Sequence, residues 1–125
     1  MTNAKILIIE DDMDNLIGLK LRLQANHYAV VGAMDAVTAI STARREQPDL
    51  ILLDLGLPAG DGFIVMDRLH KLMDVAHIPI IVISARDPAT YAERAINDGA
   101  FAFFQKPADN AELLDAIENA LGMTV

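Results

Sequence analysis

The feature that most constrains the fold is an alternation between short apolar runs and longer segments with helical spacing. The short runs are rich in β-branched residues, as buried strands are. They cover Lys5–Ile9, Ala29–Ala33, Leu50–Leu53, Ile80–Ile83 and Phe101–Phe104. In the longer segments apolar residues recur every three or four positions, which is the spacing of one helix face. We expect these helices over Asp14–Asn26, Ala36–Glu46, Phe63–Met73, Pro88–Asp98 and Asn110–Leu121. The pattern therefore predicts a (βα)5 chain.

Strands that are almost continuously apolar and alternate with helices indicate a parallel sheet with helices on both faces. We therefore predict an α/β protein with a doubly wound, five-stranded parallel sheet. Residues 1–125 are expected to form a single domain, because chains usually divide only beyond roughly 250 residues. For the strand order 2-1-3-4-5, a site is expected outside the carboxyl ends of strands 1 and 3. In the third helix, Met66, Leu69 and Met73 should share the packing face.

The charge balance limits the possible partners. The chain has 18 acidic and 10 basic residues, a net charge of -8, and its sequence contains no basic stripe. Such a surface repels nucleic acid and anionic lipid. No cysteine is present, so a disulfide framework and a thiolate zinc site are excluded. The apolar runs are too short to span a membrane. We expect a cytoplasmic protein that binds neither nucleic acid nor membrane directly.

Polar residues follow four of the predicted strands. Glu10 and Asp11 follow the first strand, Asp54 the third, Ser84 the fourth and Lys106 the fifth. Each residue alone is explained by a helix cap, a turn or a charged strand end. In the predicted topology, however, all of them meet at one edge of the sheet. Three neighbouring carboxylates repel one another unless a cation intervenes, and an all-oxygen ligand set favours Mg²⁺ over zinc.

This arrangement is suited to phosphoryl transfer. A carboxylate at Asp54 beside a divalent cation can attack a phosphorus atom in line. Lys106 and Ser84 would share the charge that develops on the phosphoryl oxygens. The expected product is an acyl phosphate on Asp54.

Four motifs carry a family resemblance: IIEDD, DLGLPAGDGF, VISA and DGAFAFFQKP. Together they resemble the receiver domain of bacterial two-component response regulators of the chemotaxis-regulator type, over essentially the whole chain. The resemblance implies a flavodoxin-like fold, Mg²⁺ as cofactor, and a phosphoryl group received from a histidine kinase or a histidine phosphotransfer protein. It also implies that Asp54 is the phosphoacceptor, that Asp11 ligates Mg²⁺ directly, that Glu10 does so through water, and that the Gly56 carbonyl completes the protein ligands.

The resemblance further implies that Ser84 and Lys106 contact the phosphoryl oxygens, and that Ser84 and Phe103 form a switch. The switch would alter a surface of the fourth helix, fifth strand and fifth helix that binds a downstream protein. Such a chain catalyses only its own phosphorylation and dephosphorylation and is not otherwise an enzyme. One departure is Gly56, because family members usually carry a larger side chain there, often methionine. By the same resemblance, Arg86, two residues beyond Ser84, and Gly56 both flank the phosphoryl group.

Three alternatives remain open at this stage. A phosphatase with an aspartate nucleophile would carry Asp-x-Asp after the first strand, where this chain has Glu10-Asp11-Asp12. A flavodoxin-like cofactor binder would need a neutral, hydroxyl-rich phosphate loop there, and this loop is acidic. A receiver-like binding module that is never phosphorylated would not need the complete set of site residues, which this chain retains.

Overall fold

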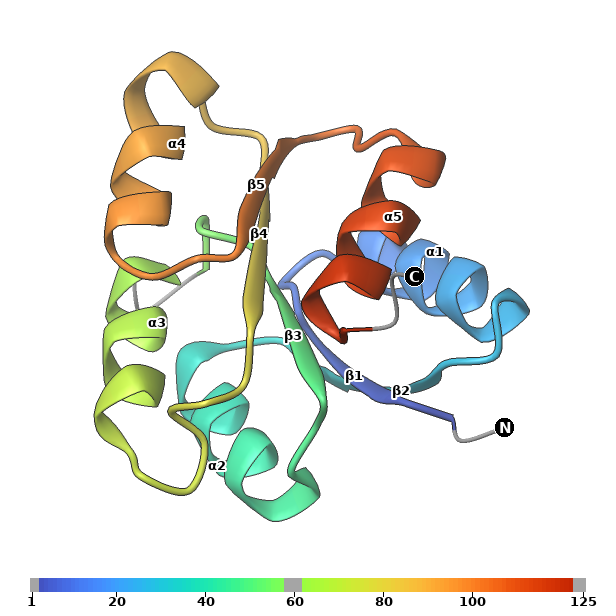
Figure 1. Ribbon diagram of the computed structural model, residues 1–125, viewed down its shortest axis with the longest axis horizontal. Helices are drawn as coiled ribbons and strands as arrows, with labels where there is room; N and C mark the ends of the chain where they lie inside the picture. Colours follow the sequence, from blue (N-terminus) through green and yellow to red (C-terminus); the bar gives the residue numbers. More distant parts are fainter. Residues whose placement is uncertain (1–2, 58–61, 123–125) are drawn as a thin grey trace.

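The computed structural model describes residues 3–57 and 62–122 (Figure 1). In this part of the chain the elements are β1 (Lys5–Ile9), α1 (Met13–Ala25), β2 (Ala29–Ala33), α2 (Ala36–Glu46), β3 (Leu50–Leu53), α3 (Gly62–Lys71), β4 (Ile80–Ser84), α4 (Pro88–Asn97), β5 (Ala102–Gln105) and α5 (Asn110–Ala120). The strands pair in parallel in the order β2-β1-β3-β4-β5. The predicted fold class and strand order are confirmed.

The largest difference from the predicted elements is at the end of α3. The helix stops at Lys71, and the N–H groups of Val75 and Ala76 both donate to the Leu72 carbonyl in the turns that follow. Met73 lies beyond the helix and is 96% exposed, so its predicted place on the packing face is wrong. The periodic pattern continued past the helix because turn residues can keep helical spacing by chance.

Helices α1, α2, α4 and α5 begin in the same way. Each follows an aspartate whose carboxylate accepts a backbone N–H from the first turn. These capping residues are Asp12, Asp35, Asp87 and Asp109. A cap of this kind typically contributes about 1 kcal/mol to helix stability. Because each cap comes soon after a strand, the helix N-termini gather at the carboxyl edge of the sheet.

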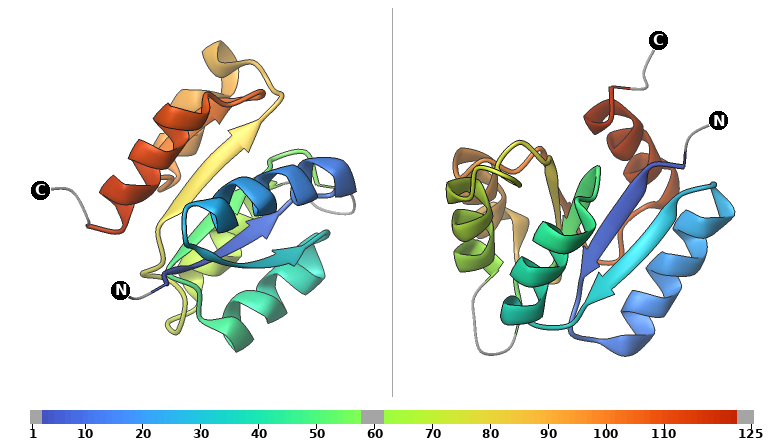
Figure 2. Two further views of the ribbon diagram at one scale, coloured as in Figure 1. Left: turned by 90° about the vertical axis from the view of Figure 1, so that its right-hand side faces the viewer. Right: turned by 90° about the horizontal axis from the view of Figure 1, so that it is seen from below.

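The sheet is covered on both faces. Helices α1 and α5 pack on one face and α2, α3 and α4 on the other, and Figure 2 shows the same layers from two further directions. The central strands β3 and β4 are buried along their whole length. Within residues 3–57 and 62–122, no helix has the length and apolar character that a membrane crossing requires.

Candidate functional site

The carboxyl ends of the strands bring the predicted site residues to one edge of the sheet. The N–H of Asp54 donates to the carbonyl of Ile9 over 3.0 Å, so the residue after β3 is held beside the end of β1. The N–H of Lys106 donates to the carbonyl of Ser84 over 2.8 Å, which joins the ends of β5 and β4 in the same way. Strand register therefore fixes the backbone of these side chains.

The acidic residues form a cluster. Glu10, Asp11 and Asp54 each offer one carboxylate oxygen, and these oxygens all lie within 4.8 Å of one another. Glu10 and Asp54 are buried, with 2% and 8% of their surface exposed, whereas Asp11 faces solvent. Asp12 serves a different purpose, because its carboxylate accepts the Asn15 N–H over 3.0 Å and caps α1. The acidic run thus divides into two site residues and one cap.

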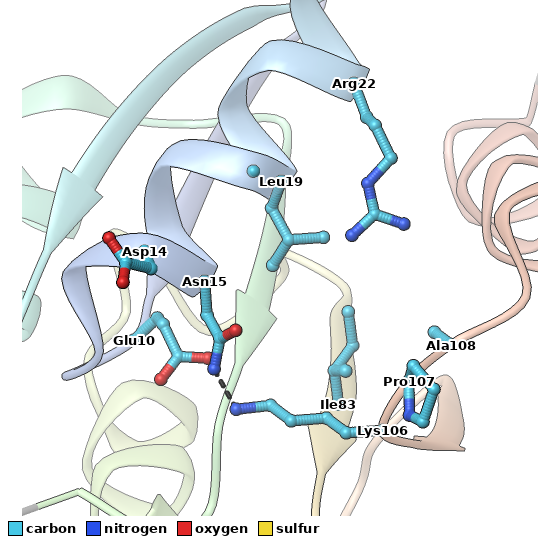
Figure 3. Close-up of a pocket in the computed structure, with 10 residues that line it drawn as sticks. Glu10, Asp14, Asn15, Leu19, Arg22, Ile83, Lys106, Pro107 and Ala108 are labelled. Carbon is cyan, nitrogen blue, oxygen red and sulfur yellow. Dashed lines mark hydrogen bonds and ion pairs between the residues drawn. The ribbon is translucent and has the colours of Figure 1, made fainter.

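Lys106 supplies the positive charge in this cluster. Its Nζ lies 2.6 Å from Glu10 Oε1 and 3.4 Å from Asp54 Oδ2, and Figure 3 shows the ion pair with Glu10. Burial opposes the charged form of the lysine, but the hydrogen bond to Glu10 and the charge of Asp54 outweigh that cost and raise the pKa of Lys106. Lys106 is therefore cationic at neutral pH.

The cluster fits a hard divalent cation. Burial raises the pKa of the Glu10 carboxyl, and the charge of Asp54 adds to this, while hydrogen bonds from Lys106 and the Asp12 N–H oppose it. Concentrated negative charge of this kind is relieved by a cation. The donors are all oxygen, and Asp11 leaves one side open to solvent, which suits Mg²⁺ with its retained waters.

The remaining predicted residues lie on or just after β3, β4 and β5. Ser84 is the last residue of β4 and is fully buried, and its Oγ accepts the Arg86 N–H over 3.0 Å. The Gly56 N–H donates to Asp54 Oδ1 over 3.2 Å. A Cβ added at Gly56 would lie 3.8 Å from both carboxylate oxygens of Asp54, so this position borders the Asp54 carboxylate. Phe103 lies on β5 and packs, partly buried, against the core beneath α2, α3 and α4. Its role as a switch residue stays a prediction.

Gly62 has a role that sequence reasoning missed. It is the first residue of α3, and its N–H donates to the Leu55 carbonyl over 3.0 Å. A Cβ at this position would lie 2.6 Å from Leu55 Cα and 2.8 Å from the Asp54 carbonyl oxygen. The absence of a side chain therefore lets α3 pack directly against the backbone that carries Asp54. The sequence carries no signal for this role, because glycine is common near helix starts and turns.

A groove of about 390 Å³ runs from the site between α1 and the segment that joins β5 to α5. Figure 3 shows Glu10 and Lys106 at one end and Arg22 at the other. Between these two ends the groove is lined by the apolar side chains of Leu19 and Ile83. A molecule in this groove would touch α1 and Lys106 at the same time.

Comparison with known proteins agrees with this geometry. The family model of the response regulator receiver domain matches residues 6–118. The chain is 36% identical over 117 residues to the response regulator PleD of Caulobacter vibrioides, covering 94% of this chain but only 26% of PleD. It is 30% identical to the protein PilH of Pseudomonas aeruginosa, covering 94% of this chain and 98% of PilH.

Solved structures of receiver domains have the same fold as this chain. The receiver domain of the sensor histidine kinase PA1611 from Pseudomonas aeruginosa, solved with a magnesium ion coordinated in its active site cleft, superposes with a TM-score of 0.86 at 27% identity. The match covers 97% of this chain and 99% of that one. The fold, the acidic cluster at the carboxyl edge and the family match together establish that this chain belongs to the response regulator receiver domain family of two-component systems.

Proposed function

We propose that this receiver domain, a single unit over residues 1–125, accepts a phosphoryl group on Asp54 in a Mg²⁺-dependent reaction. The donor is the phosphohistidine of a histidine kinase or of a histidine phosphotransfer protein. One observation carries the proposal. The Asp54 carboxylate lies in a cluster with Glu10 and Asp11 while the Lys106 ammonium is 3.4 Å from its Oδ2. An attacking carboxylate, metal ligands and a charge-stabilising cation thus share one edge of the sheet.

The reaction needs little from the protein beyond position and charge. A carboxylate oxygen of Asp54 attacks the phosphorus, a P–O bond forms, and the P–N bond of the donor breaks with its electron pair left on the imidazole. Lys106 and the Ser84 hydroxyl stabilise the charge on the phosphoryl oxygens. Asp11, Asp54 and the Gly56 carbonyl, with Glu10 acting through water, would hold Mg²⁺, which would supply further positive charge next to those oxygens.

The acyl phosphate is later hydrolysed. Water attacks the phosphorus, and the bond to Asp54 breaks to release inorganic phosphate and restore the carboxylate. The chain thus acts on itself and turns over no other substrate. We propose that this reaction takes place in the cytoplasm. The net charge of -8 supports the absence of direct binding to nucleic acid and to anionic membranes.

Intact-mass measurement after incubation with acetyl phosphate tests this proposal. We expect one phosphoryl adduct with Mg²⁺ and none with chelator, because donor and site carboxylates otherwise repel. Asp54→Asn should take up no adduct. Asp11→Ala should lose the thermal stabilisation that Mg²⁺ gives the wild type, since a ligand of the native state stabilises by mass action. Labelling of Asp54→Asn at the wild-type rate would contradict the assignment of the acceptor.

Phosphorylation is proposed to alter the surface formed by α4, β5 and α5. Ser84 and Lys106 would move toward the phosphoryl group, and Phe103 would turn into the space that they leave. Two large apolar side chains near this surface, Ile96 and Phe101, are 46% and 48% exposed, which supports the binding of a downstream protein there. Amide chemical shifts should change on phosphorylation in α4, β5 and α5. Changes confined to α1 and α2 would argue against this surface.

A further inference from the structure

Helix α3 makes a close contact with a glycine position at each of its ends. At its start, a Cβ on Gly62 would lie only 2.6 Å from the Leu55 Cα. Near its end, the His70 ring fills the space next to Gly99, where an added Cβ would lie 2.6 Å from His70 Cε1 and 3.2 Å from its Nδ1. Gly99 also has a φ of 109°, which favours glycine. Neither contact leaves room for a methyl group.

Gly99 belongs to the turn that joins α4 to β5. Its N–H donates to the Ile96 carbonyl over 3.0 Å, and the Phe101 N–H donates to the Ile80 carbonyl over 2.7 Å. The side chains of Ile96 and Phe101 are the two exposed apolar groups of the proposed partner surface. The His70 ring therefore packs against backbone that positions this surface.

The helix between the two contacts is stiff. Gly62 and His70 are eight residues apart, which corresponds to roughly two turns and about 12 Å of hydrogen-bonded helix. Its core side chains, Val65, Met66 and Leu69, are buried apolar groups, and packed helices slide past such contacts by small amounts. A shift imposed at the start of α3 is therefore expected to reach its end.

We propose that α3 couples the backbone of the Asp54 site to the turn between α4 and β5, with His70 as the positioning residue at its far end. A change at the site would then reach the partner surface through α3 as well as through Ser84 and Phe103. Coupling is reciprocal, so a partner bound to that surface would change the Mg²⁺ affinity of the site. The link through α3 does not depend on the chemistry at Asp54, whereas its use in signalling rests on the proposed function.

Gly62→Ala tests this coupling without a phosphoryl group. The added Cβ pushes α3 away from the backbone of Leu55, so the amide resonances of Leu55 and Phe101 should both shift relative to the wild type. Phe101 is a suitable reporter because its amide proton is hydrogen-bonded to Ile80. Gly18→Ala adds a Cβ that meets nothing within 4 Å and should shift neither resonance.

Removal of the His70 ring should break the connection. In a His70→Ala background, Gly62→Ala should still shift Leu55 but leave Phe101 unchanged. His70→Leu keeps bulk at this position without an aromatic ring, so it should preserve the Phe101 response and exclude a ring-current effect. His77→Ala makes the same change at an exposed histidine and should also preserve it.

Two outcomes of this experiment would overturn the proposal. One is a Phe101 response to Gly62→Ala that persists in full in the His70→Ala background, which would mean that the shift reaches α4 by another contact, such as that of Arg94 with Phe63. The other is an unchanged Phe101 resonance in folded Gly62→Ala, which would mean that α3 absorbs the shift.

Mg²⁺ titration gives a second measurement that needs no substitution at Gly62. In the wild type, Mg²⁺ should shift the amide resonances of both Leu55 and Phe101, and in His70→Ala it should shift Leu55 alone. An equal Phe101 shift in His70→Ala, or none in wild-type protein whose Leu55 responds, would refute the role of α3. A wild-type Leu55 resonance that does not respond to Mg²⁺ would instead contradict the proposed metal site.

Discussion

The floor and the mouth of the site are built differently. The floor is formed by Glu10, Asp54 and Lys106, whose charges are largely shielded from water and paired at 2.6 and 3.4 Å. We call Gly56 and Arg86, which follow β3 and β4 at the same edge, the mouth. Gly56 is exposed and has no side chain, and the Arg86 guanidinium lies over the partly buried Tyr91 ring. Unpairing a buried charge is expensive, whereas contacts at a solvated edge are weak. For the proposed phosphoryl transfer, we therefore expect changes at the floor to affect the reaction strongly, and changes at the mouth to affect mainly the lifetime of the phosphoryl group.

The largest effect is expected from Lys106→Met at the floor. This variant keeps most of the apolar stem and removes the charge that is proposed to face the phosphoryl group during transfer. The loss of one such electrostatic group typically costs a factor of about 10²–10³ in rate. Labelling with acetyl phosphate measures this directly. Phosphoryl uptake at close to the wild-type rate would mean that Lys106 pairs with Glu10 but does not stabilise the phosphoryl group during transfer.

The second effect is on stability and is expected at Gly62, where α3 packs against the backbone of Asp54 and Leu55. Gly62→Ala places a Cβ against the Leu55 Cα and the Asp54 carbonyl oxygen, which are backbone atoms that cannot rotate away. We expect a loss of about 1–3 kcal/mol in the free energy of unfolding, the usual cost of overpacking. Denaturant unfolding measures this loss. Gly18→Ala is the control for an added Cβ. It should be at least as stable as the wild type, because a Cβ there meets nothing within 4 Å and alanine favours a helix interior. Wild-type stability of Gly62→Ala would show that α3 moves freely away from Asp54.

The residues of the floor could be predicted from the sequence, whereas the end of α3 could not. The alternating apolar runs predict a parallel sheet, and the carboxyl ends of its strands place Glu10, Asp54 and Lys106 at one edge. Their meeting was predictable because backbone register places them there. The end of α3 was not predictable. The turns that follow it are formed by hydrogen bonds to the Leu72 carbonyl, and such backbone bonds leave no periodic pattern in the sequence.

Contacts that depend on side-chain direction were also beyond sequence reasoning. Nothing in the spacing of Arg86 and Tyr91 shows that the guanidinium lies over that ring, since the two residues are on opposite sides of the α4 N-cap. The clash that a side chain at Gly62 would cause likewise depends on how closely α3 approaches β3. Periodicity predicts which face of an element is buried, but it does not give the distance between two packed backbones.

The smallest effect is expected at the mouth, from Gly56→Met. The Gly56 backbone lies outside the left-handed region that favours glycine, so a longer side chain is accommodated without backbone strain. Its Cβ would lie 3.8 Å from both Asp54 carboxylate oxygens, where a methionine shields the acyl phosphate from water. A barrier higher by about 0.5–1.4 kcal/mol slows phosphoryl loss roughly two- to tenfold. Gly18→Met adds the same side chain on α1 and should leave the loss rate unchanged when acetyl phosphate is the donor. Faster loss from Gly56→Met would show that bulk at this position does not exclude water.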